Sequence, residues 1–189
     1  MQISDVVVER GGRRIVHGVT LDVPAGEVTT MLGPNGAGKS TLASAIAGLL
    51  RITSGEVVVN GENVTNRRRE RVRPSGISVV PEGRKLLPDL TIEENMKVAT
   101  YSLPKGAAKE GIDYTLSLFP ELEKRWKIGG RLLSGGEQQM VVLAQALVSK
   151  PKVLVVDELS LGLAPIVVKR LVPVLQQVAH AGVGVFLIE

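Results

Sequence analysis

The chain has 189 residues, which is enough for one sizeable hydrophobic core but not clearly for two. Hydrophobic residues make up 44% and aromatic residues only 3%, so the core must be aliphatic, which suits a buried and largely parallel sheet. Cysteine is absent and the net charge is +4, which excludes a disulfide framework or a thiolate metal site and leaves a mild basic bias. No apolar run is long enough to span a bilayer and the N-terminus does not resemble a signal peptide, so we expect a soluble or peripheral protein.

The first part of the chain is typical of short β-strands joined by turns. We expect these strands at Ile3–Val8, Arg13–Val16, Val19–Val23 and Glu56–Val59. Gly11-Gly12 and Pro24-Ala25-Gly26 are turn signals, and Asn60-Gly61 is a strong signal for a two-residue hairpin. The pattern predicts a β-rich layer around the motif that follows.

Residues 33–40 read G-x-x-x-x-G-K-S, the pattern of a phosphate-binding loop. A β-prone run at Glu27–Leu32 precedes it and a helical pattern at Thr41–Leu50 follows it, which is the context that the motif requires. The glycines let backbone N–H groups turn inward, and the helix adds the positive end of its dipole. We expect Lys39 to reach the β- and γ-phosphates of ATP and Ser40 to coordinate Mg²⁺. The predicted nucleotide-binding residues of this segment are Gly33, Pro34, Asn35, Gly36, Ala37, Gly38, Lys39, Ser40 and Thr41.

An arginine-rich segment follows at residues 66–73, where five arginines lie within eight positions. One interpretation is a contact for an anion or a nucleic acid, and the other is a solvated short helix before the next strand. We favour the second interpretation, because no aromatic residues interleave with the arginines as in single-strand binding surfaces.

The middle of the chain is predicted to be helical. A strand at Ile77–Val80 ends in a loop, and two helices follow, from the N-cap Thr91 to about Ser102 and over Ala107–Phe119. Because this region shows no strand pattern, we predict a helical subdomain at about residues 85–150, inserted into a core formed by residues 1–84 and 151–189.

The last part of the chain carries a second nucleotide motif. Ser134 and Glu137 form a predicted capping box for a helix to about Ser149, and the strand Val153–Val156 then ends in Asp157 and Glu158. Open α/β sheets bind ligands at the carboxyl ends of their strands, so we expect Asp157 to hold Mg²⁺ and Glu158 to act as general base on the attacking water. Lys39 and Glu158 are therefore the expected catalytic residues. A helix from Pro165 to about His180 and a strand at Gly184–Ile188 complete the prediction.

The order of these motifs, G-x-x-x-x-G-K-S, then L-S-G-G-E-Q, then four apolar residues and D-E, resembles that of the ABC ATPases over essentially the whole chain. The resemblance implies one ABC ATPase domain at residues 1–189. Its fold would be α/β, a P-loop NTPase (RecA-like) core with an N-terminal antiparallel β layer and an inserted α-helical subdomain. It also implies a second ABC ATPase subunit, identical or different, because the signature residues would cap ATP bound to that subunit through a helix N-terminus. These signature residues are Leu133, Ser134, Gly135, Gly136 and Glu137.

Three segments, at residues 80–84, 87–95 and 160–165, are similar to the ATP-binding subunits of branched-chain amino acid importers (LivF-type). This resemblance implies transmembrane permease partners, an indirect link to a substrate-binding protein, no nucleic acid, and a peripheral place on the cytoplasmic face of the inner or plasma membrane. Glu82 stands where most relatives have a glutamine that senses Mg²⁺ and the membrane partner, so it is an expected Mg²⁺ contact, and residues 86–95 would face the permease. Arg10 stands where an adenine-stacking aromatic is usual, Leu159 where a proline is usual, and Ala164 where many relatives have an aspartate.

Two alternatives stay open at this point. The basic bias is compatible with a non-transport ABC ATPase that acts on nucleic acid or the ribosome. The resemblance also implies a switch residue and further helices after Glu189, so the chain is expected to be a truncated domain with weak stability and little ATP turnover of its own.

Overall fold

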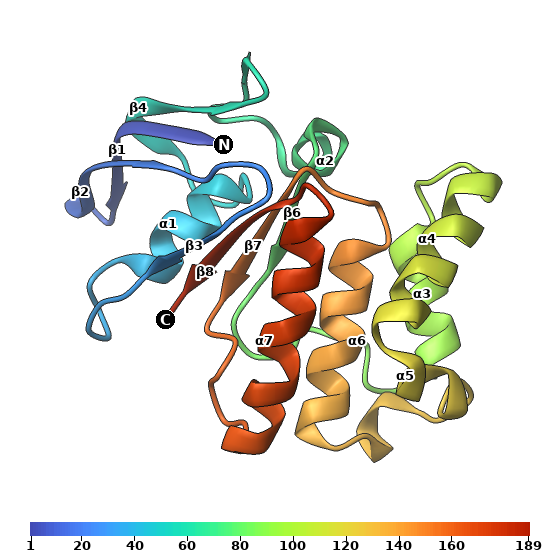
Figure 1. Cartoon of the computed structure of the whole chain (residues 1–189). Coiled ribbons are helices and arrows are strands. Elements are labelled where there is room, and N and C mark those ends of the chain that lie inside the picture. The colour runs from blue at the N-terminus through green and yellow to red at the C-terminus, as the bar shows by residue number, and fades with distance from the viewer.

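The computed structural model describes all 189 residues and contains two four-stranded sheets (Figure 1). The first sheet is antiparallel with the order β2-β1-β4-β5. Its strands are β1 (Gln2–Arg10), β2 (Arg13–Asp22), β4 (Ile52–Val59) and β5 (Glu62–Asn63). The hairpin signal at Asn60-Gly61 is confirmed, since both residues have positive φ angles (50° and 78°) between β4 and β5.

The prediction of two separate strands at Arg13–Val16 and Val19–Val23 is wrong, because β2 runs through both. Val6 pairs with Val19 and Val7 pairs with His17, so Gly18 is an extra residue in the ladder. Its φ of 79° places it in the left-handed region, as in a bulge that begins with glycine. Gly18, which lies between the two expected strands, therefore forms a bulge within one continuous strand.

The second sheet is parallel with the order β3-β8-β7-β6. Its strands are β3 (Val28–Met31), β6 (Ile77–Val80), β7 (Val153–Asp157) and β8 (Gly184–Ile188). Every residue of β7 is buried, and successive side chains point to opposite faces. Val153 and Val155 pack into one core with the antiparallel sheet, whereas Leu154 and Val156 pack into the other core with the helices. Burial on both faces explains why this strand is a continuous apolar run.

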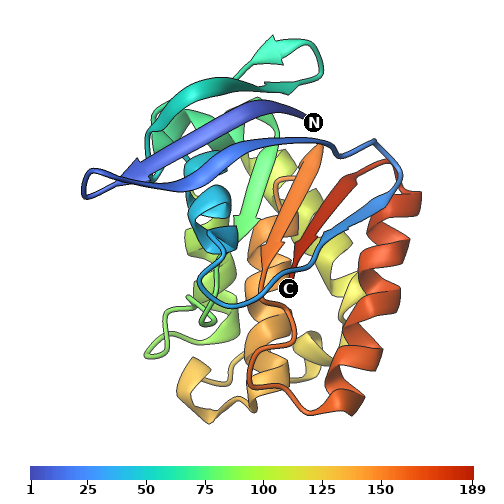
Figure 2. The same cartoon turned by 90° about the vertical axis from the view of Figure 1, so that its left-hand side faces the viewer.

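Two long helices cover one face of the parallel sheet, α6 (Gly135–Leu147) and α7 (Pro165–His180), as Figure 1 shows. Helix α1 (Lys39–Ile46) lies on the other face, between this sheet and the antiparallel layer (Figure 2). It is shorter than the predicted Thr41–Leu50. Gly48 has a φ of 70°, and a Cβ there would lie 2.6 Å from the Arg67 carbonyl oxygen, so the chain turns away at this point.

The region between β6 and β7 is helical, as the sequence predicts. It contains α3 (Ile92–Thr100), α4 (Lys105–Leu118), α5 (Pro120–Lys124), the short turn η2 (Gly130–Leu132) and α6. Helix α6 packs against α3, α4 and α5 and also contributes to the core beneath the parallel sheet. It is therefore the element through which the outer helices contact the sheet.

The arginine-rich segment forms α2 (Arg69–Val72) and the turn η1 (Arg73–Ser75). A short helix is confirmed, but the segment is only partly solvated. Arg67 is bonded to Glu62 and Ser75, and Arg73 donates to the carbonyl oxygens of Ala99 (2.7 Å) and Gln145 (3.3 Å). These two arginines tie the segment to the rest of the fold.

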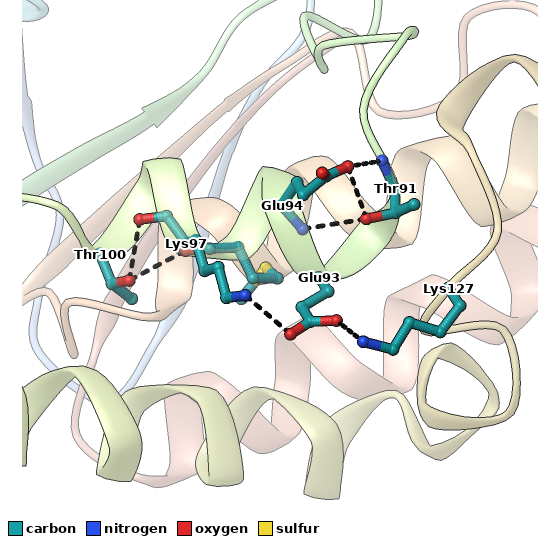
Figure 3. A network of polar contacts seen from close by, with 7 residues as sticks. Thr91, Glu93, Glu94, Lys97, Thr100 and Lys127 are labelled. Carbon is teal, nitrogen blue, oxygen red and sulfur yellow. Dashed lines mark hydrogen bonds and ion pairs between the residues drawn. The ribbon is translucent and has the colours of Figure 1, made fainter.

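Polar contacts fix the start of α3 (Figure 3). Thr91 N donates to Glu94 Oε2 (2.8 Å) and Glu94 N donates to Thr91 Oγ1 (3.2 Å), which confirms the predicted N-cap and completes a capping box. Glu93 forms ion pairs with Lys97 and Lys127, and hydrogen bonds from these two lysines lower the pKa of Glu93 to about 2. The network joins the first turn of α3 to the segment after α5.

Asn95 holds the loop before α3. Its side chain is fully buried, accepts from Leu87 N (2.8 Å) and donates to the carbonyl oxygens of Leu87, Leu90 and Thr91. Gln145 of α6 donates to the same side chain. One buried asparagine therefore bonds backbone groups of Leu87, Leu90 and Thr91 and satisfies its own amide group in doing so.

Two glycines of α4 give a matched pair of substitutions for a test of this packing. A Cβ on Gly111 would lie 2.0 Å from the Val148 carbonyl oxygen at the end of α6, whereas a Cβ on Gly106 would meet nothing within 4 Å. Gly111→Ala should destabilise the fold by roughly 1–3 kcal/mol through overpacking, and Gly106→Ala should stabilise it by up to about 1 kcal/mol through helix propensity. Urea unfolding measures both, and equal effects of the two changes would contradict the close approach of α4 to α6.

Candidate nucleotide site

The phosphate-binding loop lies between the end of β3 and the start of α1. Gly38 is the N-cap of α1 with a φ of 93°, and a Cβ there would lie 2.7 Å from the Ile15 carbonyl oxygen of β2, so only glycine fits. The Lys39 side chain is almost fully buried. Its ammonium group donates to the carbonyl oxygens of Gly33 (2.7 Å) and Pro34 (3.1 Å) at the other end of the loop. The loop is therefore closed around the ammonium group of Lys39, which a bound phosphate would contact.

A hollow of about 380 Å³ opens beside this loop. Its lining residues are Ile15, Asn35, Gly36, Gly38, Lys39, Ser40, Thr41, Glu82, Glu158 and Leu161. The structure thus brings both expected catalytic residues, Lys39 and Glu158, to one hollow. The predicted residues Gly33, Pro34 and Ala37 belong to the loop but do not line the hollow. Positively charged, hydroxyl and carboxylate groups together are the donor set that a nucleotide with a divalent cation requires.

Asp157 lies beside the hollow at the carboxyl end of β7. Its carboxylate Oδ1 accepts a hydrogen bond from Ser40 Oγ (3.2 Å), and the side chain is buried. Burial raises the pKa of Asp157 above its ordinary value, and the nearby charges of Glu82 and Glu158 act in the same direction, although the Ser40 hydrogen bond and Lys39 oppose them. A cation bound beside this carboxylate would therefore stabilise its ionised form.

The residues present fit Mg²⁺. The pair of Ser40 and Asp157 offers oxygen atoms only, which a hard cation prefers, and Mg²⁺ is usually held by one or two carboxylates together with phosphate and water. No three acidic or histidine side chains come close enough to form a complete metal cluster. Glu82 is exposed and lies on the loop after β6, where it lines the hollow.

Glu158 has a left-handed backbone, with a φ of 55°. Its N–H donates to the Ile188 carbonyl oxygen of β8 (2.8 Å), and the next side chain, Leu159, is buried in the helical core. Positive φ is uncommon for a residue other than glycine, and such positions are over-represented at functional sites. Here the turn brings Glu158 to the hollow while Leu159, which stands at the position where a proline is usual, anchors the chain in the helical core.

The signature residues lie elsewhere, at the N-terminus of α6. Glu137 N donates to Ser134 Oγ (3.3 Å) and Ser134 N donates to Glu137 Oε2 (2.8 Å), which is the predicted capping box. Arg125 forms an ion pair with Glu137 (3.0 Å). Burial alone would raise the pKa of Glu137, but the hydrogen bonds from Ser134 and the charge of Arg125 outweigh it and the pKa lies below its ordinary value. None of residues 133–137 lines the hollow of the same chain.

Sequence reasoning missed two lining residues, Ile15 and Leu161. Ile15 comes from β2 of the antiparallel layer, and Leu161 from the segment between β7 and α7. Ile15 stands in no motif, and only the close approach of β2 to Gly38 reveals it. Leu161 stands in the segment 160–165, but nothing in that segment's sequence indicated that it lines the hollow. Arg10 lies at the end of β1, opposite Arg13, and does not line the hollow.

The fold and the site together define an ATP-binding cassette. Residues 16–160 match the ABC transporter family, and the chain belongs to this family of ATPases that are coupled to transport. Among its relatives is the high-affinity branched-chain amino acid transport ATP-binding protein BraG of Pseudomonas aeruginosa, 40% identical over 95% of this chain and 77% of that protein. Another is the probable branched-chain amino acid transport ATP-binding protein LivF of Archaeoglobus fulgidus, 40% identical over 80% of this chain and 64% of that protein.

Solved structures agree with the fold. A nucleotide-free ATP-binding cassette from an ABC transporter superposes over 100% of this chain and 80% of its own, with a TM-score of 0.88 and 24% identity. An ATP-binding subunit of an ABC transporter superposes over 99% of this chain and 78% of its own, with a TM-score of 0.83 and 28% identity. ABC ATPases work as dimers with transmembrane permease components. None of the helices described above has the length and apolarity required to cross a membrane.

The raised pKa of Asp157 predicts a stabilising substitution. Because folding raises the pKa of Asp157, ionisation of this side chain lowers the free energy of unfolding. The loss of stability is complete above the pKa of the folded state and absent below the pKa of the unfolded state. Asp157→Asn should therefore raise the melting temperature of the nucleotide-free protein at pH 7, by about 2–4 °C for each ~1 kcal/mol relieved. The gain should shrink as the pH falls through the folded pKa and be lost below the ordinary pKa of an unfolded aspartate, about 3.9.

Asp113→Asn, at an exposed position of α4, is the matched control and should leave the melting temperature nearly unchanged. Scanning calorimetry across pH measures both variants. A lower melting temperature for Asp157→Asn at pH 7 would contradict the assigned cost of burying the carboxylate.

Proposed function

We propose that the chain is the ATP-binding and ATP-hydrolysing subunit of an importer for branched-chain or related amino acids. The hollow that joins Lys39, Ser40 and Glu158 supports the chemistry. The substrate class rests on the printed functions of the two relatives at 40% identity, whose lengths the chain matches over 77% and 64%.

The proposed mechanism assigns one task to each group. Lys39 and the loop N–H groups would bind the phosphates, while Ser40 and Asp157 would hold Mg²⁺, which would supply neutralisation of phosphate charge. Glu158 accepts a proton from the attacking water. The water oxygen forms a bond to the γ-phosphorus as the bond from that phosphorus to the bridging oxygen breaks, so ADP and phosphate leave.

A second ATPase subunit would complete the site. Residues 134–137 lie at the N-terminus of a helix of 13 residues but away from the hollow of their own chain. A head-to-tail dimer would place them against the γ-phosphate bound by the other subunit, where helix N-termini favour anions.

The permease would dock in a second hollow, of about 450 Å³, between α2, α3, β6 and α6. This hollow lies beside residues 86–95, the permease contact expected from the sequence, but none of those residues lines it. Its floor is apolar, and the exposed side chains of Leu49 and Val98 stand at its edge. Its three charged lining residues, Arg69, Arg73 and Lys85, are all basic. Arg73 has no carboxylate partner and its buried Nε has no hydrogen-bond acceptor, while burial lowers the pKa of its guanidinium. A short permease segment with apolar side chains and an acidic residue would match this surface.

Two substitutions test the catalytic assignment. Lys39→Ala should abolish ATP binding, because the buried ammonium is removed from the closed loop. Glu158→Gln should retain ATP binding but lower turnover by roughly 10²- to 10⁴-fold, since the amide cannot accept the water proton. Calorimetric ATP binding and phosphate release by the assembled transporter measure the two effects, and full turnover in Glu158→Gln would exclude Glu158 as the base.

From the basic lining of this second hollow we expect the affinity for the permease to depend on charge. Lys85→Glu should weaken association with the permease about tenfold, which is ~1.4 kcal/mol, because it introduces repulsion toward an acidic segment. Lys109→Glu, an exposed change on α4 outside the hollow, should have no effect. Co-purification with the permease measures both, and equal retention of the two variants would place the docking surface elsewhere.

A further inference from the structure

Arg84 joins three segments that carry different motifs. It lies on the loop after β6, two residues beyond Glu82. Its Nη2 donates to the carbonyl oxygens of Leu161 (3.1 Å) and Gly162 (2.7 Å), in the segment between β7 and α7 that follows Glu158. The side chain therefore spans from one wall of the nucleotide hollow to another.

The same guanidinium lies against the start of α6. A Cβ on Gly135 would be 2.7 Å from Arg84 Nη1, and a Cβ on Gly162 would be 3.1 Å from Nη2. The N-termini of α6 and α7 lie at the same end of the molecule, the lower end in Figure 1. Arg84 thus occupies the space between the signature residues and the segment that leads from Glu158 to α7.

The backbone of Arg84 is also unusual. Its φ is 48°, directly after Gly83 at 86°, and its carbonyl oxygen accepts from Leu86 N (2.8 Å). A left-handed backbone at a residue other than glycine persists where the surrounding contacts hold it. The two carbonyl bonds are the contacts that aim this side chain across the gap.

The partners of Arg84 are backbone carbonyls, and it forms no ion pair with a carboxylate. A planar guanidinium presents several N–H donors in fixed directions, so one group can bond two carbonyl oxygens and still face Gly135. A lysine ammonium keeps the charge but not this geometry.

We propose that Arg84 is a positioning residue that holds the signature residues at a fixed place relative to Glu82, Glu158 and Leu161. This inference rests on the proposed function. Arg84 links the part of the chain that binds its own nucleotide to the part that is presented to the second subunit. A change at Arg84 should impair the assembled site while the P-loop of the same chain binds ATP normally.

The first experiment compares Arg84→Gln and Arg84→Lys with the unchanged protein in the assembled transporter. We expect kcat for ATP to fall about tenfold or more in Arg84→Gln, with KM changed less than twofold, and Arg84→Lys to recover part of kcat. Arg170→Gln is the control, because that guanidinium is exposed and forms only a surface ion pair with Glu121, so kcat should be unchanged.

The second experiment does not depend on turnover. Hydrogen exchange in the chain without nucleotide should be faster in Arg84→Gln at residues 134–137 and 159–163 and unchanged in α1. ATP-driven self-association of Glu158→Gln, measured by sedimentation, should weaken at least fivefold when Arg84→Gln is added, while ATP affinity stays within twofold.

The outcomes distinguish a failure of the proposed ATPase function from a failure of the positioning role of Arg84. If the unchanged protein has no ATP turnover, the proposed function fails, and exchange and self-association still decide the role of Arg84. Unchanged exchange at both segments, or unchanged self-association, overturns the inference. Normal kcat in Arg84→Gln also overturns it, even where exchange is faster, because the contact would then be structural only.

Discussion

The burial of β7 on both faces is the constraint on which the rest of the structure depends. Its alternate side chains belong to two separate cores, one beneath the antiparallel layer and one beneath α6 and α7. A strand in the middle of a sheet and between two cores has little freedom to shift. Asp157, the last residue of this strand, is therefore fixed against Ser40 of α1 with an accuracy that a surface loop would not provide.

This rigidity has an electrostatic cost. Asp157 is buried near two further carboxylates, Glu82 and Glu158, and only Lys39 and the Ser40 hydroxyl offset their repulsion. Lys39 meanwhile bonds the carbonyl oxygens of its own loop. The site thus holds its carboxylates and its one ammonium group around the same hollow, where a divalent cation would offset the carboxylates and a phosphate would contact the ammonium. Sites that hold their charges ready in this way require little reorganisation when the ligand arrives.

Much of this arrangement could be predicted from the sequence. The phosphate loop, the strand before Asp157 and the two capping boxes follow local rules of glycine, apolar runs and N-cap residues, which the structure obeys. Gly18 shows where local rules fail, because only the neighbouring strand decides whether a glycine ends a strand or forms a bulge. The roles of Ile15 and Arg84 could not be predicted, although Arg84 stands in the segment 80–84, since these roles come from contacts across the chain, with Gly38 and with residues 161–162.

The capping box of α6 has a chemical consequence for Ser134. The hydroxyl oxygen accepts the Glu137 N–H, so a lone pair of that oxygen is used within the helix, while the backbone and side-chain hydrogen bonds from Ser134 lower the pKa of the Glu137 carboxyl. The carboxylate that completes the box is paired with Arg125, so its charge is largely compensated. The end of α6 therefore presents the N–H groups of a helix N-terminus beside a neutralised acid, which is a surface that attracts oxyanions and offers little to cations.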